Sequence, residues 1–323
     1  MKAIVQDRFG DADVLEFREI DEPSPGPDEV TIRVRAAGSG PDVWHLMTGL
    51  PYFVRLMPGF HKTKTRVPGR DASGIVEAVG ANVTRLVPGD EVMGVVEGSF
   101  AELAVGKADK LVAKPQRLTF EQAAAAPISG LTALQALRDV ARVREGQRVL
   151  VIGAGGGVGT LTVQVAKAFG AHVTGVAGTS KIELVRSVGA DEAIDYTRER
   201  FTDGVRRWDA IVDTAGRRSL LELRRALVPG GTLAIVGGEG GGRWTGGFFR
   251  QILRAPLLSL VVGRRLRPVV SKESLEDLEA LRELLEAGSV TPVVGRTFPL
   301  IEAPDAIRFL EQGHAPGKIV VTA

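Results

Sequence analysis

The spacing of apolar and polar residues changes near residue 115 and separates two kinds of predicted structure. Before this point, short β-rich segments are broken by Gly and Pro; residues 30–35 alternate strictly, and similar stretches occupy 73–79, 91–96 and 100–105. A two-residue period is typical of strands with one buried face. The first part of the chain is therefore predicted to form an all-β, barrel-like domain.

After residue 115, apolar-periodic helices alternate with short, continuously apolar strands. We expect helices at 133–140, 157–169, 180–188 and 219–227, and strands at 148–152, 172–176, 193–195, 210–213 and 232–236. Strict alternation of strand and helix predicts a parallel, doubly wound sheet of the Rossmann type, which is a nucleotide-binding architecture.

The end of the chain carries helices at 274–287 and 302–312, a β-like stretch at 290–298 and a final strand at 318–321. Because a strand ends the chain after the Rossmann-like part, we expect the chain to cross back and complete the first domain. The predicted fold is α/β, with residues 1–121 and 271–323 in a discontinuous first domain and residues 122–270 in a dinucleotide-binding domain.

Composition narrows the classes of function. The 41 Lys and Arg nearly balance the 39 Asp and Glu, which argues against a nucleic-acid-binding protein with a basic face. The chain has no cysteine, so disulfides and cysteine-ligated metal sites are excluded. The start of the chain does not read as a signal peptide, and no apolar run approaches the roughly 20 residues of a membrane span. We expect a cytoplasmic protein without stable membrane insertion.

A glycine-rich turn lies in the middle of the chain, in the segment VLVIGAGGGVGTLTVQVAKAFGA at 149–171. Glycine permits a tight turn and a close approach of the backbone to a pyrophosphate, and the N-terminus of the following helix offers free N–H groups. Both the preceding strand and the following helix are predicted here, so the turn indicates dinucleotide binding; a merely tight turn is the alternative. The residues expected to bind the cofactor in this turn are Gly153, Gly156, Gly157, Val158 and Gly159.

The loop after the next strand, Ala177 to Lys181, favours NADPH as the cofactor. Enzymes that use NAD commonly carry Asp or Glu at this place to hold the ribose 2′-hydroxyl, whereas here no carboxylate precedes Glu183. Hydroxyl groups and a lysine suit a 2′-phosphate, which needs donors and positive charge. NADH is the less favoured cofactor, and the alternative interpretation makes Ser180 a helix cap and Lys181 a solvated residue of the first turn.

The sequence resembles the medium-chain dehydrogenase/reductase superfamily, in particular its zinc-independent, zeta-crystallin-like quinone oxidoreductase branch. Besides the glycine turn, the similar motifs are Gly146-Gln147, Gly69-Arg70-Asp71-Ala72-Ser73-Gly74, Pro88-Gly89-Asp90-Glu91-Val92, Gly189-Ala190-Asp191 with Asp195-Tyr196, and Gly317-Lys318. They are spread over essentially the whole chain.

This resemblance implies a GroES-like β-barrel for the first domain, an active site in the cleft between the two domains, and a homodimer. It further implies that Thr132 lies near the nicotinamide and that Thr179, Ser180, Lys181 and Tyr196 surround the adenosine phosphate. For Thr132, a buried helix hydroxyl is the alternative interpretation.

A comparison with the zinc-dependent branch of the same superfamily predicts that no metal is bound. That branch uses Cys and the His of a Gly-His-Glu motif, and the matching positions here read Ser39-Gly40-Pro41-Asp42 and Gly69-Arg70-Asp71. The loop with four cysteines is missing, and the histidines at 45, 61, 172 and 314 show no ligand spacing.

Without a metal, a polarised double bond is an easier substrate than an alcohol. We expect hydride transfer from NADPH to a small molecule such as a quinone or enone, leaving an anion that one weak donor or water protonates. Tyr52 is the first candidate donor, and Asp42 and His45 precede it on what the resemblance makes a cleft-lining helix. A packed loop aromatic and a partly exposed helix histidine are the alternatives for Tyr52 and His45. Gly40 stands where the family usually carries Asn, a departure that weakens any transferred substrate contact.

The segment 237–267 combines glycines with an aromatic and aliphatic stretch flanked by arginines. We expect Gly237 and Gly238 to approach the nicotinamide, and Phe248, Phe249 and Leu253 to line a hydrophobic entrance. The segment is predicted to form a lid or a dimer surface, with lipid contact as the alternative. Two other functions stay open, namely a non-catalytic NADPH-binding structural or regulatory protein and a carbonyl reductase of the alcohol dehydrogenase type.

Overall fold

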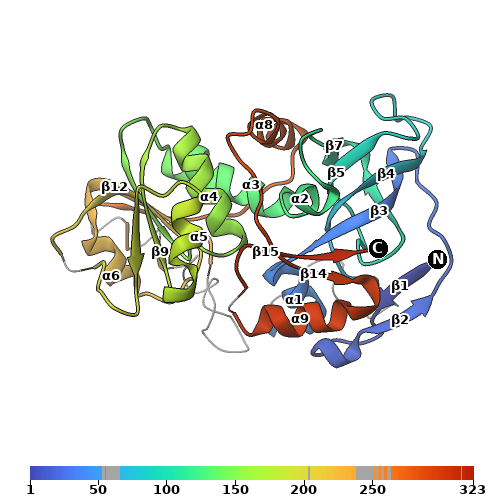
Figure 1. The fold of residues 1–323 in the computed structure, drawn as a ribbon, viewed down its shortest axis with the longest axis horizontal. Helices are drawn as coiled ribbons and strands as arrows, with labels where there is room; N and C mark the ends of the chain where they lie inside the picture. Colours follow the sequence, from blue (N-terminus) through green and yellow to red (C-terminus); the bar gives the residue numbers. More distant parts are fainter. Residues whose placement is uncertain are drawn as a thin grey trace. The chain divides into compact units, whose positions relative to one another are not determined.

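The computed structural model describes residues 1–52, 55, 66–202, 204–237, 251, 254–255, 258–259, 263–313 and 315–323. The chain divides into two compact units (Figure 1), unit 1 with Met1–Leu131 and Glu273–Ala323, and unit 2 with Thr132–Lys272. Unit 1 extends to Leu131, whereas the sequence suggests a boundary at 121. The first turn of helix α3 (Pro127–Gln135) is bonded within unit 1, where the Ile128 N–H donates to Asp71 Oδ1 at 2.8 Å.

Unit 1 is built on a seven-stranded sheet in the order β14-β15-β3-β4-β5-β7, with β6 paired to β3. The C-terminal strand β15 pairs antiparallel with β3, so the last residues of the chain complete a sheet that the first hundred residues begin. The strands are β3 (Glu29–Ser39), β4 (Asp71–Val79), β5 (Glu91–Val95), β6 (Leu103–Lys107), β7 (Leu111–Ala113), β14 (Val294–Pro299) and β15 (Lys318–Thr322), and a separate pair consists of β1 (Lys2–Val5) and β2 (Glu16–Glu19).

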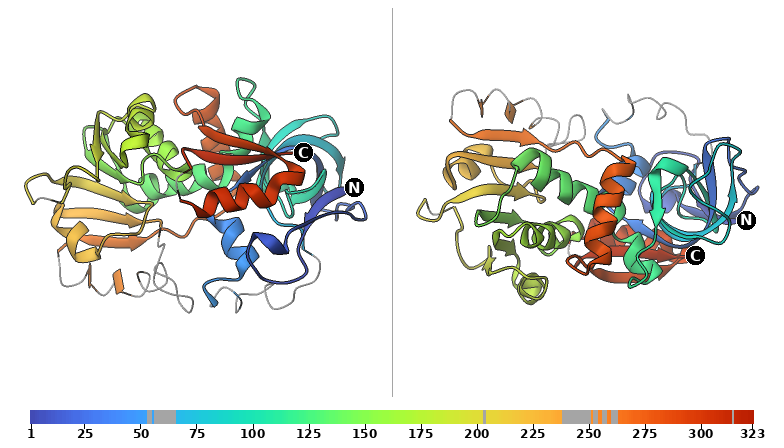
Figure 2. Two further views of the ribbon diagram at one scale, coloured as in Figure 1. Left: turned by 60° about the horizontal axis from the view of Figure 1, so that its bottom comes forward. Right: turned by 90° about the horizontal axis from the view of Figure 1, so that it is seen from above.

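Short helices fill the gaps around this sheet. They are α1 (Pro41–Thr48), α2 (Phe120–Ala124), α8 (Leu275–Glu286) and α9 (Ala303–Glu311), with 3₁₀ turns at Ala12–Val14, Ala108–Lys110 and Leu300–Glu302. Helix α9 lies beside β14 and β15 (Figure 2) and buries Ala306 and Ile307 in the core of the unit. Helix α2 begins with a capping box formed by Thr119 and Gln122, which satisfies two N–H groups that a helix start leaves free.

Unit 2 contains a six-stranded parallel sheet in the order β10-β9-β8-β11-β12-β13. The strands are β8 (Arg148–Ile152), β9 (His172–Ala177), β10 (Glu192–Asp195), β11 (Trp208–Asp213), β12 (Leu227–Ile235) and β13 (Arg265–Pro268). The central strands β8 and β11 are buried along almost their whole length, as expected for parallel strands covered on both faces, and only Arg148 at the start of β8 is exposed. The predicted α/β fold with a doubly wound parallel sheet is therefore confirmed.

The helices of unit 2 connect these strands. They are α4 (Gly157–Ala168), α5 (Ile182–Ser187) and α6 (Leu220–Arg225), with a 3₁₀ turn at Thr179–Lys181 and a π-helical segment, Ala136–Ala141, that continues α3. Helices α4 and α5 pack on β8, β9 and β10, and the π-helical segment packs on β11 and β12. Parallel strands joined in this way all present their carboxyl ends at one edge of the sheet, and that edge carries the glycine turn.

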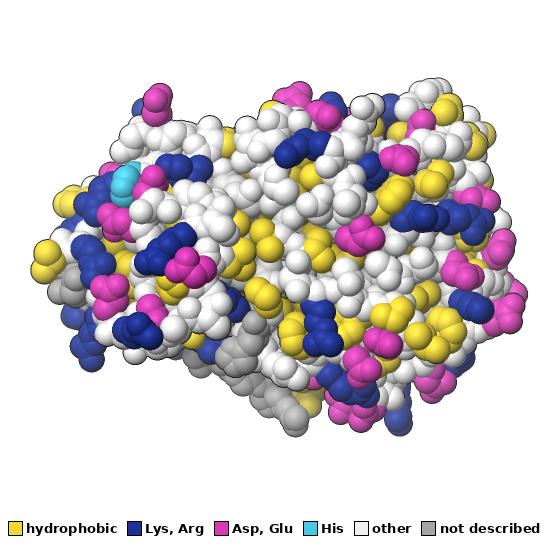
Figure 3. Space-filling model, in the orientation of Figure 1, with side chains coloured by type: hydrophobic (Ala, Val, Ile, Leu, Met, Phe, Trp, Pro, Cys, Tyr) yellow, Lys and Arg dark blue, Asp and Glu magenta, His cyan; other side chains and the backbone are white. Residues whose placement is uncertain are grey.

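The distribution of charged side chains on the surface agrees with the nearly equal numbers of basic and acidic residues in the sequence. On the face drawn in Figure 3, acidic and basic side chains are interspersed. Within the part of the chain that the structure describes, no helix has both the length and the apolar character needed to cross a bilayer.

Candidate functional site

The glycine turn at the end of β8 has a backbone that only glycine accommodates. Gly153 has a φ of +80°, and the N–H groups of Gly153 and Ala154 both donate to the carbonyl of Val176 on β9, at 3.1 and 3.0 Å. At Gly159, in the first turn of α4, a Cβ would stand 2.0 Å from the Gly153 carbonyl oxygen. The turn is therefore closed by backbone contacts that a side chain would break.

The N-terminus of α4 is open toward this turn. Gly156 is the N-cap, and no side chain caps the helix, so the amides of its first turn, which include Gly157 and Val158, are left for another acceptor. A Cβ on Gly156 would meet only the Gly153 carbonyl, at 3.5 Å. This cradle fits the pyrophosphate of a dinucleotide, because the helix end supplies both donors and positive partial charge.

The loop after β9 forms the second part of the site in unit 2. The stem of Lys181 passes close to Gly155, where a Cβ would stand 2.8 Å from both Cβ and Cδ of the lysine. Burial lowers the pKa of Lys181. The ring of Tyr196 lies beside Gly178, with its hydroxyl 3.5 Å from the place of a glycine Cβ, and the side chain is half exposed. Ser180 is exposed in the same loop.

Thr179, predicted to contact the adenosine phosphate, is bonded within the protein. Its hydroxyl donates to Asp195 Oδ2 at 2.5 Å and lies 3.1 Å from the hydroxyl of Thr197. Asp195 ends strand β10, and its other oxygen accepts from the N–H and the hydroxyl of Thr197, at 2.9 and 2.7 Å. Asp195 is not among the site residues predicted from the sequence, although an acid at the end of a predicted strand beside Tyr196 was the available signal.

The ends of β11 and β12 meet the glycine turn from the other side. Thr214 donates its hydroxyl to the Ile152 carbonyl at 2.8 Å and stands 2.5 Å from the place of a Cβ on Gly153. The buried carboxylate of Asp213 accepts from the N–H groups of two following residues, and burial raises its pKa. Gly237 donates its N–H to the Asp213 carbonyl at 2.9 Å, so this predicted residue does lie at the carboxyl edge of the sheet.

Of the remaining predicted residues of unit 2, the structure describes Thr132 but not those of the segment after Gly237. Thr132 is buried in α3, which agrees with the alternative interpretation of a buried helix hydroxyl, and its place near the nicotinamide stays a prediction. Gly238 and the three apolar residues expected at a hydrophobic entrance, Phe248, Phe249 and Leu253, lie outside the described residues, as do His61 and His314.

In unit 1, the three candidate catalytic residues lie on or just after α1. Asp42 is in the first turn of this helix, and His45 follows one turn later on the same side. The Nδ1 atom of His45 lies 2.7 Å from the carbonyl of Leu50, an arrangement in which Nδ1 donates and Nε2 is left as an acceptor when the ring is neutral. No hydrogen bond joins Asp42 to His45 in the described structure.

Tyr52 is held by an arginine that sequence reasoning missed. The guanidinium of Arg55 lies over the rings of Tyr52 and Phe9, at 4.8 and 4.6 Å from their centroids. It also donates to the carbonyls of Gly49 and Thr48, at 3.0 and 3.2 Å, at the C-terminal end of α1. The positive charge of Arg55 interacts favourably with the C-terminal end of the helix dipole and with the faces of the two aromatic rings. These contacts hold the Tyr52 ring in place.

A buried ion pair lies beside the start of α1. Lys318 Nζ and Asp71 Oδ2 are 2.8 Å apart, with side chains 6% and 1% exposed. Burial raises the pKa of Asp71, while for Lys318 the facing carboxylates of Asp71 and Asp42 outweigh burial and raise the pKa. A Cβ on Gly40 would stand 2.6 Å from Asp42 Oδ1 and 3.0 Å from Lys318 Nζ, so both charged side-chain ends lie close to this backbone.

The residues at the positions of the zinc ligands do not fit a zinc ion. Arg70 is a cation and pairs with Glu273, and the Lys318 ammonium lies beside Gly40. The hydroxyl of Ser39 is buried without a hydrogen-bond partner among the described residues. Zinc sites are built from thiolate, imidazole and carboxylate ligands, and in the described part of the chain no three His, Asp or Glu side chains form such a group.

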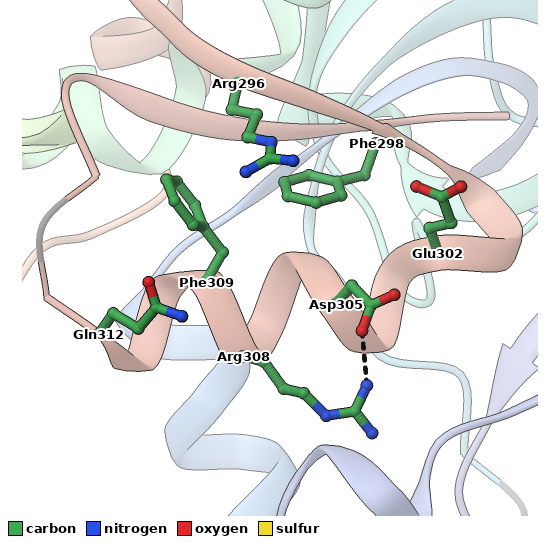
Figure 4. A pocket seen from close by; sticks show the side chains of 7 residues that line it. All are labelled: Arg296, Phe298, Glu302, Asp305, Arg308, Phe309 and Gln312. Carbon is green, nitrogen blue, oxygen red and sulfur yellow. Dashed lines mark hydrogen bonds and ion pairs between the residues drawn. The ribbon is translucent and has the colours of Figure 1, made fainter.

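A surface cavity of about 370 Å³ lies between β14 and α9 in unit 1 (Figure 4). Arg296 occupies its centre, with its guanidinium 4.7 and 5.0 Å from the ring centroids of Phe298 and Phe309. Arg308 and Asp305 form an ion pair at its border. None of the predicted catalytic or cofactor-binding residues lines this cavity. The charged side chains Arg296, Arg308 and Asp305 already contact protein groups there, so we assign the cavity no function.

Comparison with known proteins places these two sites in a family. The family described as "Alcohol dehydrogenase GroES-like domain" matches residues 26–116, and the family described as "Zinc-binding dehydrogenase" matches residues 188–321. The mouse protein named "NAD(P)H oxidoreductase RTN4IP1, mitochondrial" is 36% identical over 99% of this chain and 89% of its own length. The chain belongs to the medium-chain dehydrogenase/reductase superfamily. The predicted GroES-like domain and the predicted superfamily are thereby confirmed.

Further relatives give the branch of this superfamily. The "Chloroplast envelope quinone oxidoreductase homolog" of Arabidopsis thaliana is 32% identical over 97% of this chain and 95% of its own length. The "2-methylene-furan-3-one reductase" of Solanum lycopersicum is 34% identical, over 99% and 79%. The Escherichia coli quinone oxidoreductase, solved in complex with NADPH, covers the whole of both chains with a TM-score of 0.85 and 25% identity. The chain is thus a superfamily member of the quinone oxidoreductase branch and an NAD(P)H-dependent oxidoreductase.

Proposed function

We propose that this dehydrogenase/reductase uses NADPH to reduce quinones, enones or other activated double bonds, and that it does so without a metal ion. The observation that carries the proposal is that Arg70 stands at a zinc-ligand position of the zinc-dependent branch, and that the buried Lys318–Asp71 ion pair lies beside Gly40 at the other matching position. Without a Lewis acid, hydride transfer to an already electron-poor carbon is the easier reaction. Relatives named quinone oxidoreductase and furanone reductase support the same substrate class.

The preference for NADPH is supported by the loop after β9. Lys181 supplies a cation, Ser180 an exposed hydroxyl, and Tyr196 a phenol that has no hydrogen-bond partner among the described residues. These donors and this charge suit a 2′-phosphate. Bound NADPH supplies the hydride, and the chain contributes binding, orientation and exclusion of water.

Reduction of an enone leaves an enolate that must gain one proton. We propose Tyr52 as the donor, because Arg55 holds its ring in one place and lies where positive charge stabilises the phenolate left behind. Asp42 and His45 are the other candidates, and in the neutral ring of His45 the Nε2 atom is an acceptor that is able to take up a proton from water.

The test is a substrate panel with purified protein. NADPH oxidation is followed by its absorbance with benzoquinones, naphthoquinones and α,β-unsaturated ketones, with saturated ketones as the control. We expect turnover of the first three classes, no turnover of saturated ketones, and no loss of activity after treatment with a chelator. Tight NADPH binding without any turnover would overturn the proposal and favour a non-catalytic NADPH-binding protein. Stoichiometric zinc together with alcohol oxidation would favour an alcohol dehydrogenase.

Two further proposals concern assembly and location. A homodimer is supported by β13, which lies at the edge of the described sheet of unit 2 and pairs there only with β12. Sedimentation of the purified protein tests this. A cytoplasmic location stays a prediction, and the mouse relative is named as mitochondrial; fractionation of cells that express the full chain decides between the two.

A further inference from the structure

A carboxylate at the end of strand β10 lies against the loop that follows β9. Sequence places the first acid after this strand at Glu183, but the end of the neighbouring strand β10 brings Asp195 against Thr179. The two residues are joined by a hydrogen bond of 2.5 Å, and the Asp195 side chain is only 12% exposed. The carboxylate of Asp195 is therefore hydrogen-bonded to a residue of the loop that is expected to receive the adenosine ribose.

The hydrogen bonds of Asp195 account for the proton of the Thr179 hydroxyl. A hydroxyl has one proton, and an ionised carboxylate only accepts. Asp195 Oδ1 accepts from the N–H and the hydroxyl of Thr197, and Oδ2 accepts from Thr179, with Arg198 Nε at 3.4 Å. Since its only proton points at Asp195, Thr179 offers lone pairs alone to a bound cofactor.

The charge of Asp195 persists over the working pH range of such an enzyme. Hydrogen bonds from Thr179 and Thr197 lower the pKa of this carboxyl, because they favour its ionised form. A ribose 2′-hydroxyl is able to donate to Thr179, whereas a 2′-phosphate carries acceptors and negative charge. Both the direction of the Thr179 proton and the charge of Asp195 thus oppose a 2′-phosphate.

We propose that Asp195, acting through Thr179, is a selectivity-determining residue for the coenzyme. It limits the preference for NADPH that Lys181, Ser180 and Tyr196 create, and keeps NADH acceptable to the enzyme. The inference rests on the proposed function, in that the loop after β9 receives the adenosine ribose. Asp195 acts as a positioning residue, since it reaches the cofactor through Thr179.

The variant Asp195→Asn reverses the hydrogen bond with little change in shape. The amide oxygen of Asn keeps the turn that accepts from the Thr197 N–H, and its NH₂ group faces Thr179 as a donor. The Thr179 hydroxyl then accepts from Asn and is free to donate to a 2′-phosphate. Removal of one negative charge acts in the same direction.

The test measures the dissociation constants of NADPH and NADH by calorimetry for the full chain and its variants. For Asp195→Asn we expect the ratio Kd(NADH)/Kd(NADPH) to rise by about tenfold, mainly through tighter NADPH binding. The control is Asp191→Asn, an acid just before β10 that pairs with Lys167 at 2.8 Å and accepts from the Val173 N–H. Its ratio should stay within about twofold of the wild type, since Val173 lies at the opposite end of β9 from Thr179.

Three outcomes decide the matter. An unchanged ratio in a folded Asp195→Asn protein overturns the inference while NADPH binding itself upholds the proposed cofactor. The charge of Asp195 acts without the Thr179 hydroxyl, so part of the gain should remain when Thr179→Val is added. A gain of undiminished size in that double variant overturns the route through Thr179. Absence of binding of either coenzyme to the wild type overturns the proposed function and the inference together. If Asp195→Asn fails to fold, Asp195→Ser removes the same charge and serves in its place.

Discussion

Replacement of Lys318 by methionine should expose how strongly the buried ion pair holds unit 1 together. The ammonium of Lys318 lies 2.8 Å from Asp71 Oδ2 and donates to the Ser129 hydroxyl at 3.1 Å. Among the described residues, Asp71 has one other hydrogen bond, from the Ile128 N–H at 2.8 Å. In Lys318→Met the side chain keeps its approximate length, and Asp71 is left as a buried carboxylate with a single donor.

The cost follows from the burial of the partner that remains. Removing one member of a buried pair costs about 3 to 5 kcal/mol, because the other charge stays desolvated. For a unit of this size the melting temperature should fall by roughly 6 to 20 °C. The loss should depend on pH in a definite direction. Without the ammonium, burial raises the pKa of Asp71 in the folded state further above its unfolded value, so the deficit shrinks as pH falls and grows as pH rises through the raised pKa.

Differential scanning calorimetry at several pH values measures this effect, with Lys167→Met as the matched control. Lys167 also pairs with an acid at 2.8 Å, but its side chain and that of Asp191 are 36% and 30% exposed, so its loss should cost less than about 1 kcal/mol. The double variant Asp71→Asn with Lys318→Met should recover most of the stability, since no buried charge is left. A Lys318→Met protein as stable as Lys167→Met would refute the reasoning.

Three other expectations concern the cofactor and the proton donor. In Gly159→Ala the new Cβ would stand 2.0 Å from the Gly153 carbonyl, and we expect NADPH affinity to fall by at least about tenfold, as titration calorimetry can measure. Burial lowers the pKa of Lys181, so its charge should be lost at a lower pH than that of an ordinary lysine; NADPH affinity should hold below that pKa and fall as pH rises through it, and Lys181→Met should abolish this pH dependence. Tyr52→Phe should lower kcat on enones by about a hundredfold with little change in the KM for NADPH, whereas Tyr196→Phe should do the reverse; equal effects on both constants would contradict the roles assigned to the two tyrosines.

The local pattern of the sequence predicted most strands and helices of unit 2 and the glycine turn, but not β13, which begins within the segment 237–267 that was expected to form a lid or a dimer surface. Strand β8 consists of Arg148 and four buried apolar residues, Gly153 follows it, and α4 comes next with most of its residues buried. A glycine at positive φ, a buried parallel strand and an open helix N-terminus are all properties of neighbouring residues, so they are readable from neighbouring letters. The place of Asp42 and His45 on one helix, α1, was expected from the family resemblance alone, and the structure has that helix.

The contacts that decide selectivity and stability join residues far apart in the chain. Lys318 meets Asp71 because β15 pairs with β3, which in turn pairs with β4, and Asp195 meets Thr179 because β10 lies beside β9. Strand order and register set these contacts, and a residue's own neighbours in sequence carry no information about them. The sequence by itself thus determined the superfamily, the nucleotide-binding turn and the absence of thiolate ligands. Only the tertiary structure decided that a buried lysine stands beside Gly40 and that an acid turns the Thr179 hydroxyl inward, because burial and hydrogen-bond direction depend on strands that only folding brings together.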